Sequence, residues 1–148
     1  MIRSLDRRRQ GFSLVELAVV IVIVGVLAAF GVPRYRDSVE RTKAAEAFNY
    51  LSAVRSAQER HLALKGKYAD DPATLDIKQE LPKYFDPDLT PWMRTLGNPV
   101  TPPTWELVLT RKSDTSSYGA YTVKFTQAGF DGPGSTISPT INPIDTSP

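Results

Sequence analysis

The chain has 148 residues, 41% of them hydrophobic, with 18 basic and 16 acidic residues and no cysteine. This length fits one modest domain, and the absence of cysteine excludes disulfide bridges, thiol nucleophiles and cysteine metal sites. Four of the arginines and one of the aspartates precede Gly11. The rest of the chain is therefore near neutral and has no basic stripe that would indicate nucleic-acid binding.

The N-terminal region is predicted to span a membrane. Residues 1–10 are short, polar and rich in arginine, as is typical of a flank that stays in the cytoplasm. From residue 12 to residue 32, every residue except Ser13 and Glu16 is apolar or glycine. As a helix with ~1.5 Å rise per residue, these residues reach ~31 Å, the thickness of the hydrocarbon layer. We expect a single-pass helix with its N-terminus in the cytoplasm.

An amphipathic helix is predicted to follow. Pro33 loosens the helix without ending the pattern, because residues 34–65 contain neither proline nor glycine and are rich in good helix formers. Gly66 is the expected end of the helix, with Lys65 in its last turn. One face carries the residues expected to pack against the rest of the domain, namely Ala47, Tyr50, Leu51, Val54, Gln58, His61 and Leu62.

The remaining sequence indicates a small antiparallel sheet. Residues 68–103 contain seven prolines and are predicted to be a connection with one helical turn around residues 77–81. Residues 104–110 and 121–126 read as strands, with a third short strand or turn at 129–134 and a surface coil from Ser138. The fold class is therefore α+β. The apolar layer between helix and sheet is expected to contain Trp92, Trp105, Tyr118, Tyr121 and Phe125.

The stretch RRRQGFSLVELAVVIVIVGVLAAFGVP, residues 7–33, resembles the N-terminus of type IV prepilins and of the pseudopilins of type II secretion systems. The resemblance is strong over these residues, weakens towards residue 69 and afterwards concerns architecture alone. It implies a pilin-like fold with a leader peptide (1–11), a membrane and filament-core helix half (12–33), an amphipathic helix half (34–66), a proline-rich connection (67–103) and a sheet region with its tail (104–148). The residues that carry it are Gly11, Phe12, Ser13, Leu14, Glu16, Gly25 and Pro33.

The resemblance also implies a function. A prepilin peptidase would cut between Gly11 and Phe12 on the cytoplasmic side, and Phe12 would then be N-methylated. The product would be a structural subunit of a filament, stored in the bacterial inner membrane and carried into a pilus or periplasmic filament. Its partners would be other copies, other pilin-like subunits and an inner-membrane assembly platform. Gly25 and Pro33 mark the part of the helix that would loosen during assembly.

Glu16 is the unusual residue of the span. A carboxylate at the centre of a bilayer costs about 2.5 to 3.5 kcal/mol, although Glu16 lies nearer the edge, where an ordinary anchor would also tolerate it. The resemblance implies that Glu16 offsets the ammonium group of Phe12 on a neighbouring subunit. Such a pair is suited to setting register, because any offset that leaves either charge unpaired is costly at low dielectric.

Two alternatives remain open. Signal peptidase would release a soluble domain after the small residues at Ala29 and Gly31, or the chain would stay uncut as a simple anchor. Between a type IV pilus subunit and a secretion pseudopilin the sequence does not choose. Many proteobacterial pilins close a C-terminal loop with two cysteines, and this chain has none.

No enzyme is expected. His61, the only histidine, lies near the apolar face of the predicted helix, and no nucleophile elbow, phosphate-binding loop or HExxH pattern is present. No cofactor is expected either, with calcium as the one metal to consider. Some pseudopilins hold calcium in a C-terminal loop, and Asp131 with Asp114 or Asp145 would need carbonyls and water to complete such a site. The plain reading of Asp131-Gly132 is a turn.

Overall fold

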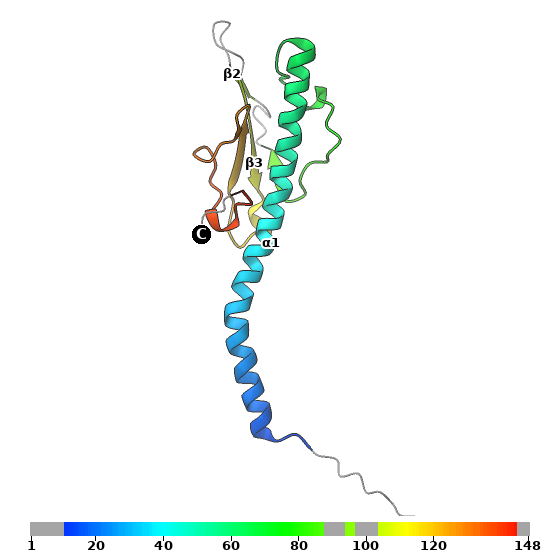
Figure 1. Cartoon of the computed structure of the whole chain (residues 1–148). Helices are drawn as coiled ribbons and strands as arrows, with labels where there is room; N and C mark the ends of the chain where they lie inside the picture. The colour runs from blue at the N-terminus through cyan, green and yellow to red at the C-terminus, as the bar shows by residue number, and fades with distance from the viewer. Residues whose placement is uncertain (1–10, 88–93, 97–103, 145–148) are drawn as a thin grey trace, which may run out of the picture. The chain divides into compact units, whose positions relative to one another are not determined.

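The computed structural model describes residues 11–87, 94–96 and 104–144 (Figure 1). A long helix, α1 (Leu14–Lys65), is followed by five short strands, β1 (Phe85–Pro87), β2 (Arg94–Leu96), β3 (Thr104–Arg111), β4 (Thr122–Thr126) and β5 (Gly129–Phe130). The chain divides into two compact units, Met1–Arg36 and Asp37–Pro148, and their boundary falls within α1. One long helix with one small antiparallel sheet confirms the predicted α+β class.

The helix ends where the sequence indicates and begins at Leu14, two residues after the start expected at residue 12. It runs through Pro33 and stops at Lys65, after 52 residues. The next residue, Gly66, has a φ of 73°, and its N–H donates to the carbonyl of Leu62 at 2.8 Å. A left-handed residue at this position closes the last turn, and glycine adopts that conformation without a steric penalty.

Within the second unit, α1 buries one stripe of side chains. The predicted apolar face is confirmed over its central part, while His61 and Leu62 at the end of the helix are only half-buried. The buried residues of α1 are Glu40, Ala44, Ala47, Phe48, Tyr50, Leu51, Val54, Ala57 and Gln58.

The sheet is organised around β3, which pairs with β1 and β2 along one edge and with β4 along the other. Leu109 lies opposite both Pro87 of β1 and Val123 of β4. Successive residues of β3 alternate between half-buried and buried, as expected for a strand with one face on the core. The strands at 104–110 and 121–126 are confirmed. β1 and β2 were not predicted, because three residues are too few to show an alternating pattern.

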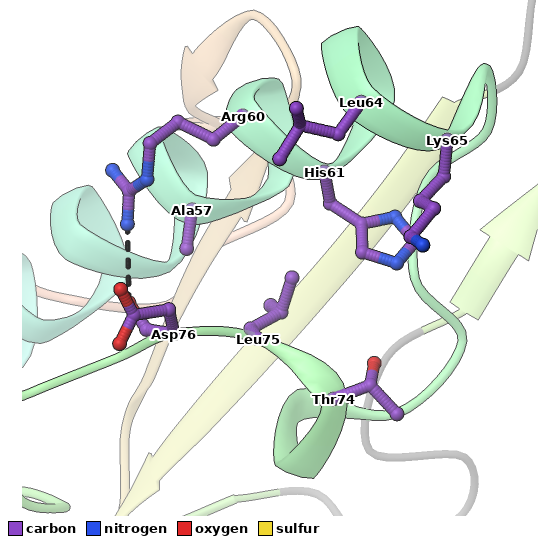
Figure 2. A pocket seen from close by; sticks show the side chains of 8 residues that line it. All are labelled: Ala57, Arg60, His61, Leu64, Lys65, Thr74, Leu75 and Asp76. Atoms are coloured by element: carbon purple, nitrogen blue, oxygen red, sulfur yellow. Dashed lines mark hydrogen bonds between the residues drawn. The ribbon is translucent and has the colours of Figure 1, made fainter.

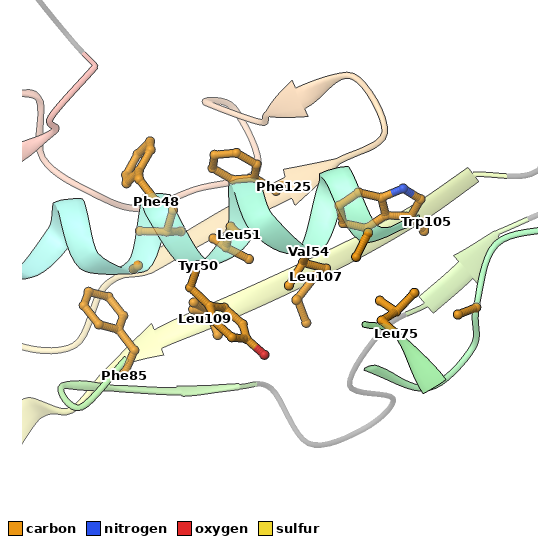
Figure 3. Packing of buried hydrophobic residues seen from close by; sticks show 14 of the residues in the cluster. Phe48, Tyr50, Leu51, Val54, Leu75, Phe85, Trp105, Leu107, Leu109 and Phe125 are labelled. Carbon is orange, nitrogen blue, oxygen red and sulfur yellow. The ribbon is translucent and has the colours of Figure 1, made fainter. Parts of the chain in front are cut away.

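The core lies between the buried stripe of α1 and the inner face of the sheet (Figure 3). Phe48 of the helix meets Phe125 of β4 edge to face, with ring centroids 5.5 Å apart. Trp105 is fully buried, Tyr121 and Phe125 are nearly so, and Tyr118 packs against them from the rim. The predicted aromatic layer is confirmed for these four residues. Trp92 lies outside the described residues.

The helical turn predicted at residues 77–81 is wrong. The connection instead forms one 3₁₀ turn at Pro72–Thr74, and the carboxylate of Asp71 accepts the N–H of Ala73 at 2.8 Å. An aspartate followed by proline is a strong start signal, because the side chain caps the turn and proline needs no partner for a backbone N–H. Ahead of this turn, the amide of Gln58 binds both backbone groups of Ala69, at 2.8 and 2.9 Å.

The surface coil predicted from Ser138 is also wrong for the described part of the tail. Residues Pro139–Ile141 form a 3₁₀ turn, with Ile141 fully buried and Asn142 7% exposed. Ile141 belongs to the apolar core, so its burial holds the segment against the domain. A single apolar residue between prolines gives no periodic signal, and the sequence therefore did not reveal it.

The free edge of β4 is covered by the loop that follows β5. In this loop the N–H of Asp131 donates to the carbonyl of Lys124 at 2.9 Å, and the hydroxyl of Ser135 accepts the N–H of Lys124 at 2.9 Å. Thr136 exchanges two further bonds with Thr122, at 2.8 and 3.1 Å. Side-chain hydroxyls thus satisfy backbone groups that would otherwise be open to pairing with another strand.

Candidate processing and assembly site

The predicted cleavage site lies just outside the helix. Residues 11–13 have no regular structure, and α1 begins at Leu14. A Cβ built on Gly11 would meet nothing within 4 Å among the described residues. The contacts among the described residues therefore give no steric reason for glycine at position 11. Phe12 is 75% exposed.

The start of α1 is encoded in the sequence beside this site. The N–H of Leu17 donates to the carbonyl of Ser13 at 3.2 Å, which makes Ser13 the residue before the first helical turn. Ser13 and Glu16 have the spacing of a capping box, and Glu16 places a negative charge in the first turn. The Ser-x-x-Glu signal is visible in the sequence, but the sequence analysis missed it. It favours a helix that starts at Leu14, two residues after Phe12.

The first unit exposes an apolar surface in this single chain. The helix is long and apolar enough to cross a membrane, and none of its most apolar window is buried. Such a continuous apolar surface is larger than soluble monomers usually expose, and it fits a helix that is covered by lipid or by other helices. Its most exposed large side chains include Leu14, Val15, Ile21, Leu27 and Phe30.

Gly25 and Pro33 both lie inside the continuous helix. A Cβ on Gly25 would meet nothing within 4 Å in the part of the chain that the structure describes. Contacts among the described residues therefore give no steric reason for glycine at position 25. The predicted loosening of the helix between them stays a prediction.

A buried ion pair joins α1 to the sheet in the second unit. Arg111 Nε of β3 lies 2.6 Å from Glu40 Oε1, and Arg111 Nη2 donates to Oε2 at 3.3 Å. The hydroxyl of Tyr121 donates to Glu40 Oε1 at 3.1 Å. Arg111 Nη1 also donates to the carbonyls of Tyr84 and Lys112, at 3.1 and 2.9 Å. Glu40 and Arg111 are 4% and 1% exposed, so this pair is shielded from water.

The charges of this cluster are matched. Burial alone would raise the pKa of Glu40, but the hydrogen bond and the charge of Arg111 outweigh it and hold that pKa below the ordinary value. Burial and the charge of Glu40 raise the pKa of Tyr121, which keeps the phenol protonated and able to donate. The sequence analysis missed Glu40. The sequence indicates the burial of Glu40 only through its position, because Glu40 lies on the same helical stripe as Ala44, Ala47 and Leu51.

The carboxylate of Asp131 already forms a hydrogen bond and an ion pair within the domain. Its Oδ1 accepts the N–H of Gly134 at 3.0 Å, and its Oδ2 lies 3.3 Å from Lys124 Nζ, which lies 2.7 Å from Glu106 Oε2. Among the described residues no three histidine, aspartate or glutamate side chains gather as a metal site. Asp114 is exposed in a separate short turn, and Asp145 lies outside the described residues. Calcium at Asp131 stays a prediction, which a higher melting temperature in calcium than in chelator would support.

The sequence comparisons identify the first segment. Residues 6–32 match the family model of the prokaryotic N-terminal methylation motif. The chain is 38% identical to the fimbrial protein EcpC of Eikenella corrodens over 73 residues, which are 49% of this chain and 48% of that protein. It is 38% identical to a fimbrial protein of Pseudomonas aeruginosa over 68 residues, 46% and 44% of the two chains.

A third relative is the type IV major pilin protein PilA of Myxococcus xanthus, 38% identical over 63 residues, which are 43% of this chain and 29% of that protein. The chain spans about half the length, or less, of these curated relatives. No solved structure matches it. From Leu14 onward the motif lies on the exposed apolar helix. The relatives are named as fimbrial or pilin proteins. In this N-terminal segment the chain is similar to type IV pilin and fimbrial proteins.

Proposed function

We propose that this chain is the structural subunit of a type IV pilus-like filament, cut between Gly11 and Phe12 and polymerised through α1. The observation that carries the proposal is the methylation motif at residues 6–32. Within that motif, the bond to be cut lies in a non-helical segment directly before the helix. A peptidase needs an extended substrate, because a helix hides the backbone groups that must enter its active site.

The proposed chemistry is hydrolysis followed by methyl transfer. Water adds a hydroxyl group to the carbonyl carbon of Gly11, the peptide bond breaks, and Phe12 keeps an ammonium group. A methyl donor supplied by the processing machinery then methylates that nitrogen. The apolar helix stays attached to the product, which is retained in the inner membrane with its partners, the prepilin peptidase and the assembly platform.

Glu16 then acts as the alignment group of the filament. In a bundle of apolar helices, the ammonium of one subunit's Phe12 lacks water and attracts the carboxylate of a neighbour's Glu16. Any stagger that leaves either charge unpaired is penalised, so the pair selects one register more than it adds stability. Lipid covers the helix before assembly, and other copies cover it afterwards.

A pilus subunit is favoured over a secretion pseudopilin. The similar proteins reported above are named as fimbrial proteins or as a major pilin. Imaging of cells with an antibody against the second unit separates the two, since a pilus extends far beyond the cell surface and a pseudopilin filament stays in the periplasm.

Release by signal peptidase is the disfavoured alternative. The small residues at positions 29 and 31 lie in the middle of α1, whereas Gly11 and Phe12 lie outside it. Cleavage after Gly31 would therefore first require local unwinding of the helix.

The test is the intact mass of the protein extracted from native membranes. We expect the loss of residues 1–11 and the gain of one methyl group. A matched pair of variants sharpens the result, because a Cβ at Gly11 or at Gly31 would meet nothing within 4 Å among the described residues. Gly11→Leu should block processing, and Gly31→Leu should leave it unchanged. Loss of residues through Gly31, or an uncut chain, would refute the proposal.

A further inference from the structure

The apolar part of α1 ends in a short basic and aromatic segment, Arg34, Tyr35 and Arg36, which we call the exit segment. Residues 14–33 contain no basic residue, and with ~1.5 Å rise per residue they reach ~30 Å, the thickness of the hydrocarbon layer. All three residues of the exit segment are exposed, Tyr35 by 70%. In a chain held in a membrane by this helix, the exit segment therefore lies at the depth of the lipid headgroups.

The direction of the helix turns these side chains towards the lipid. In an α-helix the bond from Cα to Cβ tilts towards the N-terminus, which here is the apolar end. The stem of an arginine packs along apolar surface while its guanidinium stays in a polar layer. Arg36 lies one turn beyond Val32, which is 47% exposed, so its stem can cover that surface while the guanidinium stays among the headgroups.

The acidic residues nearest in the sequence do not neutralise the exit segment. Glu16, near the other end of the span, is the one acidic residue of 11–36. Of the acids that follow in the second unit, Asp37 accepts a hydrogen bond from the hydroxyl of Tyr118, and Glu40 belongs to the buried ion pair described above. The exit segment thus carries two exposed positive charges beside acids that already have partners.

Two arginines further along α1 bind groups of their own domain instead. In the pocket of about 350 Å³ beside the end of the helix, Arg60 donates to the carbonyl of Asp76 at 3.1 Å (Figure 2). Arg55 donates to the carbonyl of Gln127 at 3.0 Å. Arg36 makes no hydrogen bond or ion pair with the described residues. Its charge is therefore available to a partner outside the chain.

We propose that the exit segment binds anionic phospholipids in the leaflet at which the apolar helix ends. The guanidinium of Arg36 donates paired hydrogen bonds to the phosphate oxygens, a geometry that suits arginine better than lysine. Arg34 lies two residues earlier, on the opposite side of the helix, and makes the same contact with a second lipid. Tyr35 supplies the amphipathic ring that is typical of membrane interfaces.

A phospholipid fits this part of the helix better than a soluble anion does. The cations directly follow a continuous exposed apolar surface, and a phospholipid carries its phosphate directly above its acyl chains. One lipid therefore covers both surfaces, whereas free phosphate would cover only the charge. The inference rests on the proposed function, in which the subunit is stored in a membrane, and it names the class of lipid that holds the stored subunit.

The lipid preference of the full chain in vesicles tests the contact. Because the protein has no cysteine of its own, Val32→Cys places a single dye one turn before Arg36. Brominated phosphatidylglycerol and brominated phosphatidylcholine are compared as quenchers, since each quenches the dye according to its presence beside it. We expect phosphatidylglycerol to be preferred. Arg36→Gln should lower that preference about fivefold, as expected for the loss of one basic residue at an anionic surface.

Two further variants separate the contact from a general effect of charge. Arg36→Lys keeps the positive charge and should retain most of the preference. Lys65→Gln is the matched control, because it removes one positive charge from the last turn of α1, outside the apolar span. It should leave the preference unchanged. Inorganic phosphate added to the vesicles should not displace the lipid.

The inference is overturned if the two lipids quench the dye equally, or if Arg36→Gln and Lys65→Gln lower the preference by the same factor. Displacement of the lipid by inorganic phosphate would also overturn it, because the site would then take a soluble anion. If Arg36→Gln kept the lipid preference but reduced the amount of subunit in filaments, Arg36 would contact another subunit rather than lipid.

The intact mass of the same preparation keeps this inference separate from the proposed function. A correctly processed chain without lipid preference would refute the lipid contact and leave the filament function intact. An unprocessed chain would refute the proposed function, whatever its lipid preference.

Discussion

At the scale of single residues, Glu40 has a structural role that its neighbours in the sequence do not indicate. It stands on the same helical stripe as Ala44 and Ala47, where an apolar residue would be expected. Arg111 of β3 and Tyr121 bind its carboxylate, and the whole cluster is shielded from water. Burying two charges is costly, and the cost is recovered only if both remain paired. The pair thus fixes one arrangement of helix and sheet.

We therefore predict that Glu40→Ala destabilises the second unit by about 3 to 5 kcal/mol, because it leaves Arg111 buried without its counter-charge. Urea unfolding of the detergent-extracted protein measures this change. Asp86→Ala is the control, since Asp86 and Lys112 form an ion pair whose side chains are 64% and 37% exposed. It should cost less than about 1 kcal/mol. If the two variants lost equal free energies of unfolding, the buried ion pair of Glu40 would contribute no more to stability than an exposed one.

The same carboxylate predicts an acid limit for the fold. The folded state lowers the pKa of Glu40 from its ordinary value of 4.5. A group with a depressed pKa contributes stability that is fully present above the unfolded value and is lost as the pH falls through the folded value. The melting temperature of the native protein should therefore fall below about pH 4.5, and that of Glu40→Gln should fall less over the same range. If the melting temperatures of the two proteins fell equally with pH, the acid sensitivity could not be assigned to Glu40.

Glu16 is predicted to act in assembly rather than in folding, since it is exposed in the single chain. Glu16→Gln keeps the size of the side chain and its ability to form hydrogen bonds, but removes the charge that is proposed to offset the Phe12 ammonium. We expect normal removal of residues 1–11 with few or no filaments, measured as the amount of subunit in the sheared surface fraction. The control is Glu80→Gln, a neutralised carboxylate exposed outside the span. Wild-type amounts of filament from Glu16→Gln would remove Glu16 from the mechanism.

At the scale of elements, the loop after β5 protects the edge of β4, and Gly134 lets that loop close. A Cβ at Gly134 would lie 2.3 Å from Asp131 Oδ2 and 2.8 Å from the Lys124 side chain. At Gly132 the nearest atom would be 3.6 Å away, an ordinary contact. The close approach of the backbone to Asp131 and Lys124 is therefore specific to Gly134.

Gly134→Ala should consequently cost about 1 to 3 kcal/mol, as overpacking usually does. Gly132→Ala is the matched control and should be near neutral. Thermal unfolding of both variants measures the difference, and light scattering of the refolded proteins reports whether an exposed β4 edge promotes association. If the two variants were equally stable, the side chains of Asp131 and Lys124 would be able to move aside at no cost in free energy.

At the scale of the whole molecule, the two units are stabilised by different environments. The unit Met1–Arg36 exposes nearly every described apolar side chain in the single chain and depends on lipid or other helices to cover them. The unit Asp37–Pro148 has its own core of helix and sheet residues and contains no disulfide. This division suits the proposed transfer of the subunit from a membrane to a filament, because a unit with its own core can keep its fold while the surroundings of the first unit change.

The sequence by itself determined the long apolar stretch, the helix and its end, the two long strands and the resemblance of the first segment to type IV pilins. These features depend on local signals, namely an apolar run, a charge boundary, Gly66 after the last turn, and alternation in residues 121–126. Only the tertiary structure decided which distant residues meet. The bond between Glu40 and Arg111 joins positions 71 residues apart, and the burial of Ile141 depends on a core built by other segments. Such contacts produce no periodic pattern in the sequence, because they depend on packing and charge between segments that are distant along the chain.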